Sequence, residues 1–211
     1  MVEKDAVRRS YDELADAYAA ERDEDDEGMT VLRAFRDGLG AEPRVLDAGC
    51  GQGSPVLAEL TASATAVGLD FSREQLRRAA ENAPDAALSQ GDLTRLPLAD
   101  DAFDAVVAYW SLIHVPLAEH GTVIDEFARV LRPGGRALVC EGASEWVGEN
   151  PDWLDSGTAM AWEIAGPEAT REQLRDAGFR IVEEWGAADS LADEDDGEDP
   201  WTFFAAALAD S

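Results

Sequence analysis

Short apolar runs alternate with amphipathic segments along most of this chain. Five of the runs are rich in aliphatic residues and too short for buried helices, which predicts the central strands of a parallel sheet. They lie at Val45–Leu46, Thr65–Asp70, Ala86–Leu88, Ala102–Tyr109 and Arg136–Cys140. Because helical patterns separate them, the order favours repeated strand-helix-strand units of an open α/β fold.

Apolar residues recur at steps of three and four positions in the intervening segments, as in amphipathic helices. Helices are predicted at Asp5–Arg22, Met29–Leu39, Pro55–Leu60, Ser72–Asn82, Glu119–Leu131 and Pro167–Ala177. Pro133, Gly134 and Gly135 are expected to stop the fifth of them. We expect the first two helices to cover the loop that follows the first strand.

The C-terminal third predicts two further strands, Phe179–Trp185 and Trp201–Leu208. The acidic segment 186–200 between them lacks the ordered D-x-D-x-D-G spacing of a calcium loop, so we interpret it as solvated.

A long segment, Gly142–Gly166, follows the fifth strand and contains Trp146, Trp153 and Trp162. Loops of this length are uncommon unless they cover a site. The three tryptophans are therefore candidates for a lid that binds the substrate. Packing against the N-terminal helices is an equally open interpretation.

Three alternating glycines follow the first strand, in the stretch R-V-L-D-A-G-C-G-Q-G that ends at Gly53. Glycine can adopt positive φ and lets a ligand approach the backbone, which favours a site for a nucleotide-like cofactor. No lysine follows as in a phosphate-binding P-loop, and G-x-G-x-G matches the dinucleotide fingerprint poorly. The alternative is a glycine-rich turn that only links strand to helix.

Acids lie at or near the ends of the first three strands, at Asp47, Asp70 and Asp92. The carboxyl ends of parallel strands meet at one edge of the sheet, where open α/β folds bind ligands. Asp70 lies where a βαβ unit places the carboxylate that binds ribose hydroxyls, while Ser72 is available to cap the next helix. Asp92 could accept a hydrogen bond from an adenine amino group, and the amide of Leu93 could meet a ring nitrogen. We expect the three carboxylates to converge around one adenosyl compound.

Further candidates lie on the first helix and after the fourth strand. Tyr11, Tyr18 and Arg22 could face the ligand, although aromatic residues at helical spacing also pack in cores. His114 is a candidate general base because an unperturbed imidazole titrates near neutrality, and a structural role is equally open. His120 is expected at the surface.

The composition fits one domain, since 211 residues with 45% hydrophobic content suffice for a core. Cys50 and Cys140 lack metal-ligand spacing, so neither a metal site nor a disulfide framework is predicted. No run of 18 apolar residues and no signal peptide is found, so we expect a cytoplasmic protein without a membrane span.

The charge is strongly negative, with 45 acidic and 17 basic side chains, a net charge of −28 and a single lysine, Lys4. Nonspecific binding to nucleic acid or anionic lipid relies on a basic face, so a polynucleotide substrate and a membrane partner are disfavoured. The acid-rich, lysine-poor composition is similar to that of proteins from extreme halophiles.

Four motifs carry a resemblance to a known family: V-L-D-A-G-C-G-Q-G, G-L-D-F-S, G-D-L-T-R-L-P-L-A-D-D-A-F-D and R-V-L-R-P-G-G. Over about residues 10–140, their order and spacing resemble class I S-adenosylmethionine-dependent methyltransferases of the small-molecule type. The resemblance implies an α/β, Rossmann-like, seven-stranded mixed sheet with helices on both faces and the last strand antiparallel, closing in a C-terminal hairpin.

By that resemblance, a cofactor site would contain the glycine loop and residues near the next strand ends. The expected contacts are Asp47, Gly49, Cys50 and Gly51 at the loop, with Gly49 and Gly51 beside the methionine moiety, Asp70 at the ribose, Phe71 beside the adenine, Asp92 and Leu93 at its edge, and Tyr109 near the sulfonium.

The implied activity is methyl transfer from S-adenosylmethionine to a small-molecule acceptor by in-line displacement, which needs no metal. One domain is expected, with cap helices in 1–40, the cofactor-binding core in 41–142, the lid in 143–167 and a helix and hairpin in 168–211. Monomer and homodimer both remain open.

A non-catalytic cofactor-binding protein is the main alternative. An NAD-dependent oxidoreductase is less favoured because no Tyr-x-x-x-Lys pair is present and Lys4 is expected far from the site. Nucleic-acid base methylation is disfavoured because the sequence A-Y-W-S at 108–111 replaces its Pro-Pro-aromatic signature.

Overall fold

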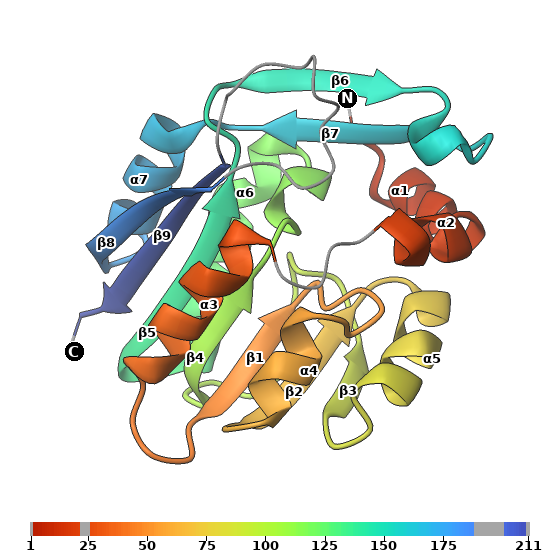
Figure 1. Ribbon diagram of the computed structural model, residues 1–211. Coiled ribbons are helices and arrows are strands. Elements are labelled where there is room, and N and C mark those ends of the chain that lie inside the picture. Colours follow the sequence, from red (N-terminus) through yellow and green to blue (C-terminus); the bar gives the residue numbers. More distant parts are fainter. Residues whose placement is uncertain (1, 22–25, 188–200, 210–211) are drawn as a thin grey trace.

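A seven-stranded sheet in the order β3-β2-β1-β4-β5-β9-β8 forms the centre of the computed structural model, which describes residues 2–21, 26–187 and 201–209 (Figure 1). The strands are β1 Arg44–Ala48, β2 Thr65–Asp70, β3 Ala87–Gln90, β4 Phe103–Ala108, β5 Leu131–Glu141, β8 Phe179–Ala187 and β9 Trp201–Leu208. The first five pair in parallel, and β9 runs antiparallel to both of its neighbours. The predicted mixed sheet with an antiparallel last strand and a C-terminal hairpin is confirmed.

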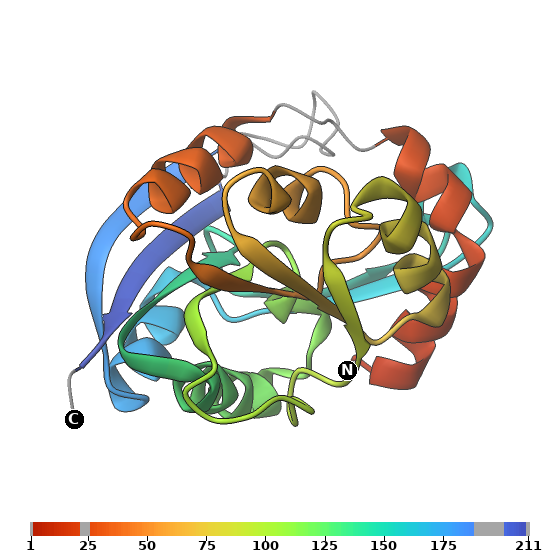
Figure 2. The same ribbon diagram turned by 90° about the horizontal axis from the view of Figure 1, so that it is seen from below.

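Helices cover both faces of the sheet (Figure 2). One face carries α3 Glu27–Asp37, α4 Val56–Thr61 and α5 Arg73–Asn82, and the other carries α6 His120–Val130 and α7 Pro167–Asp176. Each face has its own apolar cluster, one around Phe103 and Phe127 and one around Phe35 and Phe203. Burial on both faces explains why the central strands are almost continuously apolar in sequence.

Two predicted elements differ from the structure by more than a shift of their ends. The expected helix 5–22 is broken at Leu14 into α1 Lys4–Glu13 and α2 Ala15–Glu21, and Leu14 itself is buried. The glycines after the fifth predicted helix lie inside β5 rather than in a turn. Phe103 pairs with Leu131, and Ala105 already pairs with Arg136, so the extra residues are accommodated by an irregular register at the start of the strand.

The long segment after β5 forms a hairpin, β6 Trp146–Asn150 and β7 Met160–Ile164, rather than an irregular loop. It crosses above the carboxyl ends of the central strands, on the side where α1 and α2 also lie (Figure 1). A short 3-10 helix, Trp153–Asp155, lies between its strands. Most of the acidic segment 186–200 falls outside the described residues.

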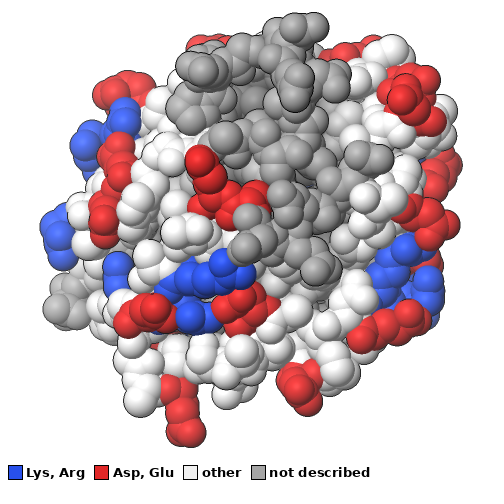
Figure 3. All heavy atoms as spheres, in the orientation of Figure 1, with Lys and Arg blue, Asp and Glu red and all other residues white. Residues whose placement is uncertain are grey.

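Acidic side chains are spread over the face shown in Figure 3, and the basic side chains there lie beside acidic ones. On the exposed side of α5, Arg77 pairs with Glu74 and Glu81. None of the helices in the described part of the chain has the length and apolar character needed to cross a bilayer.

Candidate functional site

A cavity lies at the carboxyl ends of the central strands, between the glycine loop, α1 and the segment after β4. Most of the residues predicted for the site line it, namely Tyr11, Tyr18, Gly49, Gly51, Asp70, Phe71, Asp92, Leu93, Tyr109 and His114. The topology explains this convergence, because β1, β2, β3 and β4 are parallel and end at the same edge.

Some predicted residues do not reach the cavity lining. Asp47 is 1% exposed within β1, so the expected convergence of three carboxylates is corrected to two, Asp70 and Asp92. Cys50 is also buried and does not line the cavity; burial raises the pKa of its thiol well above the ordinary value. Arg22 lies outside the described residues.

The glycine loop has the backbone geometry that its sequence predicts. Gly49 has φ +85° and Gly51 has φ +51°, a region that side chains disfavour. A Cβ atom on Gly49 would lie 2.3 Å from Cβ of Ser111, so the loop packs directly against the segment after β4. A Cβ atom on Gly51 would find nothing nearer than Oε1 of Gln75 at 3.9 Å, which leaves this part of the loop open toward the cavity.

The Asp70 carboxylate holds the glycine loop and the start of α5 together. Oδ2 accepts from the amide of Gly51 and Oδ1 from the amide of Ser72, both at 2.8 Å. Burial raises the pKa of Asp70 to about 6, against the opposing effect of these hydrogen bonds. Ser72 caps α5 as predicted, because its hydroxyl accepts from the amide of Gln75. A carboxylate retains lone pairs beyond these two bonds, so Asp70 can also accept from ligand hydroxyls.

Gln75 is a cavity residue that the sequence analysis missed. Its Nε2 donates to the carbonyl of Tyr11 at 3.2 Å, which turns Oε1 toward the glycine loop. The residue is 1% exposed, and Oε1 has no hydrogen-bond partner among the described residues. A buried acceptor left unpaired costs about 1–3 kcal/mol, so this atom is suited to a ligand donor. The sequence feature that could have indicated Gln75 is its place in the first helical turn after the Ser72 cap, shortly after Asp70.

Lys4 lines the cavity, which corrects the expectation that it lies far from the site. Its Nζ lies 2.8 Å from Oδ2 of Asp92 and 2.7 Å from Oε2 of Glu119. Burial opposes the charged form of Lys4, but the two carboxylates raise its pKa above the ordinary value. Burial likewise opposes the charge on Asp92, and the bonds from Lys4 and Thr94 lower its pKa.

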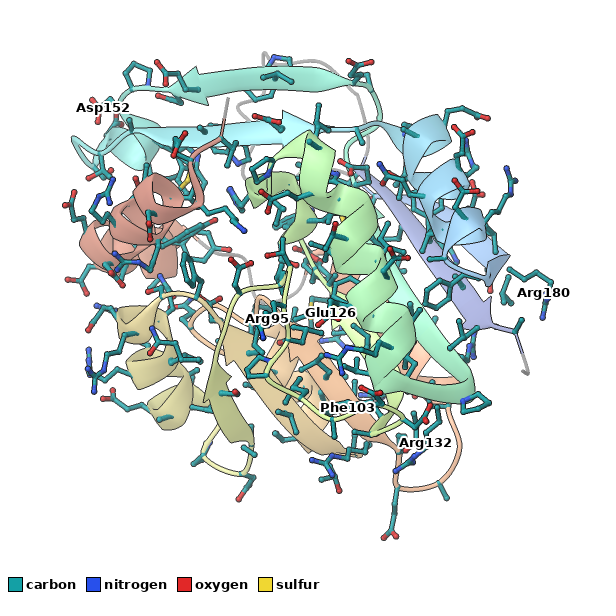
Figure 4. All side chains as sticks on the ribbon, turned by 180° about the vertical axis from the view of Figure 1, so that it is seen from behind. Arg95, Phe103, Glu126, Arg132, Asp152 and Arg180 are labelled. Carbon is teal, nitrogen blue, oxygen red and sulfur yellow. The ribbon has the colours of Figure 1, made fainter. Side chains whose placement is uncertain are left out.

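The loop that carries Asp92 is held by α6. The amide of Leu96 donates to Glu126 at 2.7 Å, and Arg129 donates to the carbonyl of Leu98 at 2.9 Å. Figure 4 shows Glu126 on α6 beside the part of this loop that carries Arg95. The loop is therefore fixed on the side away from the cavity, which keeps Asp92 and Leu93 at the cavity edge.

His114 lies at the cavity wall in a fixed tautomer. Its Nδ1 lies 3.3 Å from the carbonyl of Ala161, so Nδ1 carries the proton, and Nε2 accepts from the hydroxyl of Tyr11 at 2.8 Å. Burial lowers the pKa of His114 to about 4. The expectation of an imidazole that titrates near neutrality is therefore corrected: His114 is neutral at pH 7.

The hairpin tryptophans lie behind this wall and do not line the cavity. The Trp153 ring is 6.1 Å from that of Tyr11 and 5.8 Å from that of Tyr18, and Trp162 is 6.0 Å from His114. Trp146, 45% exposed, lies on the outer strand β6. Trp153 therefore packs on α1 and α2, Trp162 packs on the segment after β4, and Trp146 contacts Trp162.

Tyr109 and Trp110 form the aromatic side of the cavity, with ring centres 5.2 Å apart. The Tyr109 hydroxyl donates to Asp26 at 2.7 Å, which ties β4 to the first residue before α3. Sequence analysis missed Trp110 and Ser111 because no motif marks them.

His120 is fully buried, which corrects its expected surface position. Its Nε2 donates to the carbonyl of Val115 at 2.9 Å, and its Nδ1 lies 3.9 Å from Glu141. Burial raises the pKa of Glu141 to about 7. Neither residue lines the cavity, and within the described ranges no cluster of three or more His, Cys, Asp or Glu side chains could hold a metal ion.

Known proteins are similar to this chain in sequence and in fold. Residues 46–139 match a family described as a methyltransferase domain. The chain is 39% identical over 139 residues to a demethylmenaquinone methyltransferase of Beutenbergia cavernae, a match that covers 64% of this chain and 57% of that protein. The chain spans about half the length of the curated relatives it matches.

Solved structures extend the likeness to the whole fold. Magnesium protoporphyrin IX methyltransferase from Synechocystis, solved with bound SAH, superposes with a TM-score of 0.74 at 18% identity over 98% of this chain and 99% of that chain. The [4+2]-cyclase SpnF superposes with a TM-score of 0.74 at 21% identity over 97% and 96%. These identities support a shared fold alone. The matched segment, residues 46–139, is therefore similar to a methyltransferase domain, and the whole chain has the fold of solved S-adenosylmethionine-dependent methyltransferases.

Proposed function

We propose that this chain binds S-adenosylmethionine in the cavity and transfers its methyl group to a small-molecule acceptor. The observation that carries the proposal is the pair of oxygen acceptors beside the glycine loop. Asp70 and the unpaired Oε1 of Gln75 both flank Gly51, as the adjacent hydroxyls of a ribose require. Phe71 and Leu93 continue the same wall toward Asp92 and would border the adenine.

The other end of the cavity suits the reacting group. Tyr18, Tyr109 and Trp110 line it, and aromatic faces attract cations such as a sulfonium. The bound cofactor supplies a methyl group already activated by positive sulfur. The protein has to orient the acceptor and exclude water, and orientation contributes up to about 7–11 kcal/mol of barrier lowering.

His114 limits the class of acceptor. Its Nε2 can receive a proton through Tyr11, but a pKa of about 4 makes it a weak base at neutral pH. Acceptors that attack through carbon, sulfur, a neutral amine or an easily ionised hydroxyl suit such a site. The relatives named above act, by their names, on demethylmenaquinone and magnesium protoporphyrin IX, which supports a small molecule. We further propose that Trp146, Trp153 and Trp162 belong to a lid on the acceptor side.

Two measurements test the proposal. Calorimetry should detect binding of S-adenosylmethionine and not of NAD. Mass spectrometry should then detect S-adenosylhomocysteine formed with at least one acceptor of a panel containing quinols, porphyrins and phenols. Asp70→Asn should weaken the binding of S-adenosylmethionine by at least about tenfold, because the side-chain amide has one acceptor oxygen fewer. Absence of binding by the wild type would contradict the proposal.

Cofactor binding without methyl transfer is the second candidate. A solved [4+2]-cyclase shares this fold, so the fold alone does not establish methyl transfer. Binding of S-adenosylmethionine with no turnover across the whole panel would support this candidate over the first.

A further inference from the structure

Lys4 is the single lysine of the sequence, and its ammonium group lies in the cavity wall. Nζ lies 2.8 Å from Oδ2 of Asp92, 3.1 Å from Oγ1 of Thr94 and 2.7 Å from Oε2 of Glu119. An ammonium group has three N–H donors, and each has an oxygen acceptor here. The orientation of the side chain is therefore fully determined.

The same cluster fixes the Asp92 carboxylate. Oδ2 accepts from Lys4, and Oδ1 accepts from the amide and the hydroxyl of Thr94 at 2.9 and 2.8 Å. A carboxylate has about four lone-pair sites, so about one is left for a ligand. Asp92 can therefore accept from one ligand donor, in one direction.

Lys4 also begins the face of α1 that forms the cavity wall. Lys4, Val7, Arg8 and Tyr11 all line the cavity, at the spacing that places residues on one side of a helix. Near the other end of α1, Asp12 accepts from the hydroxyl of Ser72 at 2.5 Å. Both ends of α1 are thus held to the core, and Lys4 supplies the ionic contact.

We propose that Lys4 is a cofactor-positioning residue, whose ammonium group aims the Asp92 carboxylate at the adenine edge and holds α1 across the cavity. This inference rests on the proposed function, because it assigns the adenine to the Asp92 end. Lys4 acts through Asp92 and α1 and touches no reacting atom. The Lys4 and Asp92 side chains are 26% and 30% exposed, which leaves the ion pair open to screening by salt.

The first test measures the affinity for S-adenosylhomocysteine, which has no net charge and is therefore little affected by the net charge of the protein. Lys4→Met should raise the Kd about tenfold, and Lys4→Arg should keep most of the affinity because it keeps the charge. Raising the salt to about 1 M should weaken binding in the wild type more than in Lys4→Met.

The matched control is Arg77→Met. It also removes one positive charge, together with the ion pairs to Glu74 and Glu81 on the exposed side of α5. Its Kd should stay within about twofold of the wild type, since exposed pairs contribute little. If Arg77→Met and Lys4→Met lose affinity for S-adenosylhomocysteine equally, the loss is explained by the change in net charge, and the inference is overturned.

A second test separates positioning from structural support. S-Inosylhomocysteine carries a carbonyl in place of the adenine amino group, and this oxygen would face the fixed carboxylate of Asp92. Wild type should bind it at least about 30-fold more weakly than the adenosyl compound, since an unpaired acceptor is costly. In Lys4→Met the ratio of the Kd values for the inosyl and adenosyl compounds should fall below about fivefold, because the Asp92 carboxylate can turn away from the inosyl carbonyl. An unchanged ratio would overturn the inference.

The outcomes separate the two proposals. If wild type does not bind S-adenosylhomocysteine, the proposed function fails; if wild type and Lys4→Met bind it equally, only the role of Lys4 fails. Should Lys4→Met not fold, acetylation of the wild type provides the test. Because the sequence has one lysine, peptide mass spectrometry reports this side chain alone. Bound S-adenosylhomocysteine should slow its acetylation, and equal rates with and without the compound would overturn the inference.

Discussion

The hydroxyl of Tyr11 lies 2.8 Å from Nε2 of His114, and this bond joins α1 to the segment after β4 at the cavity wall. The ring of Tyr11 also stands at 89° to that of His114, with centres 5.2 Å apart. The pair therefore gives the cavity a neutral polar group; protonation of Nε2 would reverse the bond, so that His114 donates to the Tyr11 hydroxyl.

His114 should titrate far below neutrality. NMR of the two histidine side chains should show the His114 ring neutral throughout pH 6–8, since burial lowers its pKa to about 4. Its folded pKa lies below the ordinary value, so protonation on acidification destabilises the fold. Tyr11→Phe should lower kcat for an acceptor that must lose a proton and change cofactor affinity less than about twofold. A His114 inflection near pH 6.5 would contradict this account.

Cofactor affinity should depend on pH through Asp70. Its pKa is raised to about 6, so the carboxylate is ionised above that pH and becomes protonated as pH falls through it. Because the ionised form accepts from ribose hydroxyls, the Kd for S-adenosylhomocysteine should rise below pH 6, approaching about tenfold per pH unit. Calorimetry from pH 8 to pH 5 measures this. Asp70→Asn should bind weakly with no such dependence, and a flat wild-type profile would count against the assignment.

Glu141 should destabilise the protein at alkaline pH. Burial raises the pKa of Glu141 in the folded protein from 4.5 to about 7. The free energy of unfolding therefore falls as pH rises through this range. Glu141→Gln should therefore add up to about 3 kcal/mol to the free energy of unfolding at pH 8 and less than about 1 kcal/mol at pH 5. Denaturant unfolding at both pH values provides the measurement. Glu145→Gln, at an exposed site nearby, should change the free energy of unfolding by no more than about 0.5 kcal/mol at either pH.

Gly49→Ala should disrupt the cofactor loop. The new Cβ would lie 2.3 Å from Ser111 and the residue would keep φ +85°, so a loss of about 2–4 kcal/mol and of cofactor binding is expected. Gly157 is the control: its φ is +76°, but a Cβ there would meet nothing within 4 Å. Gly157→Ala should cost only about 1–2 kcal/mol for its backbone and leave binding intact. Thermal melts measure the stability of both variants, and calorimetry measures their cofactor affinity. Equal losses in Gly49→Ala and Gly157→Ala would show that the contact with Ser111 has no effect beyond that of the backbone conformation.

Trp153 and Trp162 should affect the acceptor more than the cofactor. They pack on Tyr11 and His114, so alanine at either position should loosen that wall and raise acceptor KM by about fivefold or more. Cofactor Kd should stay within about twofold. Trp146→Ala, on the exposed outer strand, should have a smaller effect. Loss of both acceptor and cofactor binding in Trp153→Ala would contradict the assignment to the acceptor side.

Residues close to the parallel strands could be predicted from the sequence because local signals fix them. Asp70 ends a strand, Ser72 starts a helix, and Gly49 needs positive φ; together these place the ligand edge. Asp47 satisfies the same local pattern but is buried within its strand, and position along a strand alone does not distinguish the two cases.

Residues on α1 and after β4 could not be placed in the same way. Lys4 begins an amphipathic helix, where a lysine usually faces solvent, and only its docking beside Asp92, 88 positions away, makes it part of the cavity. His120 follows a 3-10 turn, Leu117–Glu119, and its ring is buried between the carbonyl of Val115 and Glu141. Such contacts depend on tertiary packing, which periodicity does not encode.

The hydrogen bond from the amide of Val2 to Glu163, at 2.5 Å, joins residues 161 positions apart. During synthesis on the ribosome, α1 emerges before β7, so this anchor is made only after Glu163 has been translated. The binding chamber therefore closes late, and shorter nascent chains that already contain the glycine loop lack one of its walls. Long-range closure of this kind is slow relative to local helix formation, so the growing polypeptide should gain ligand binding only after β7 has been translated.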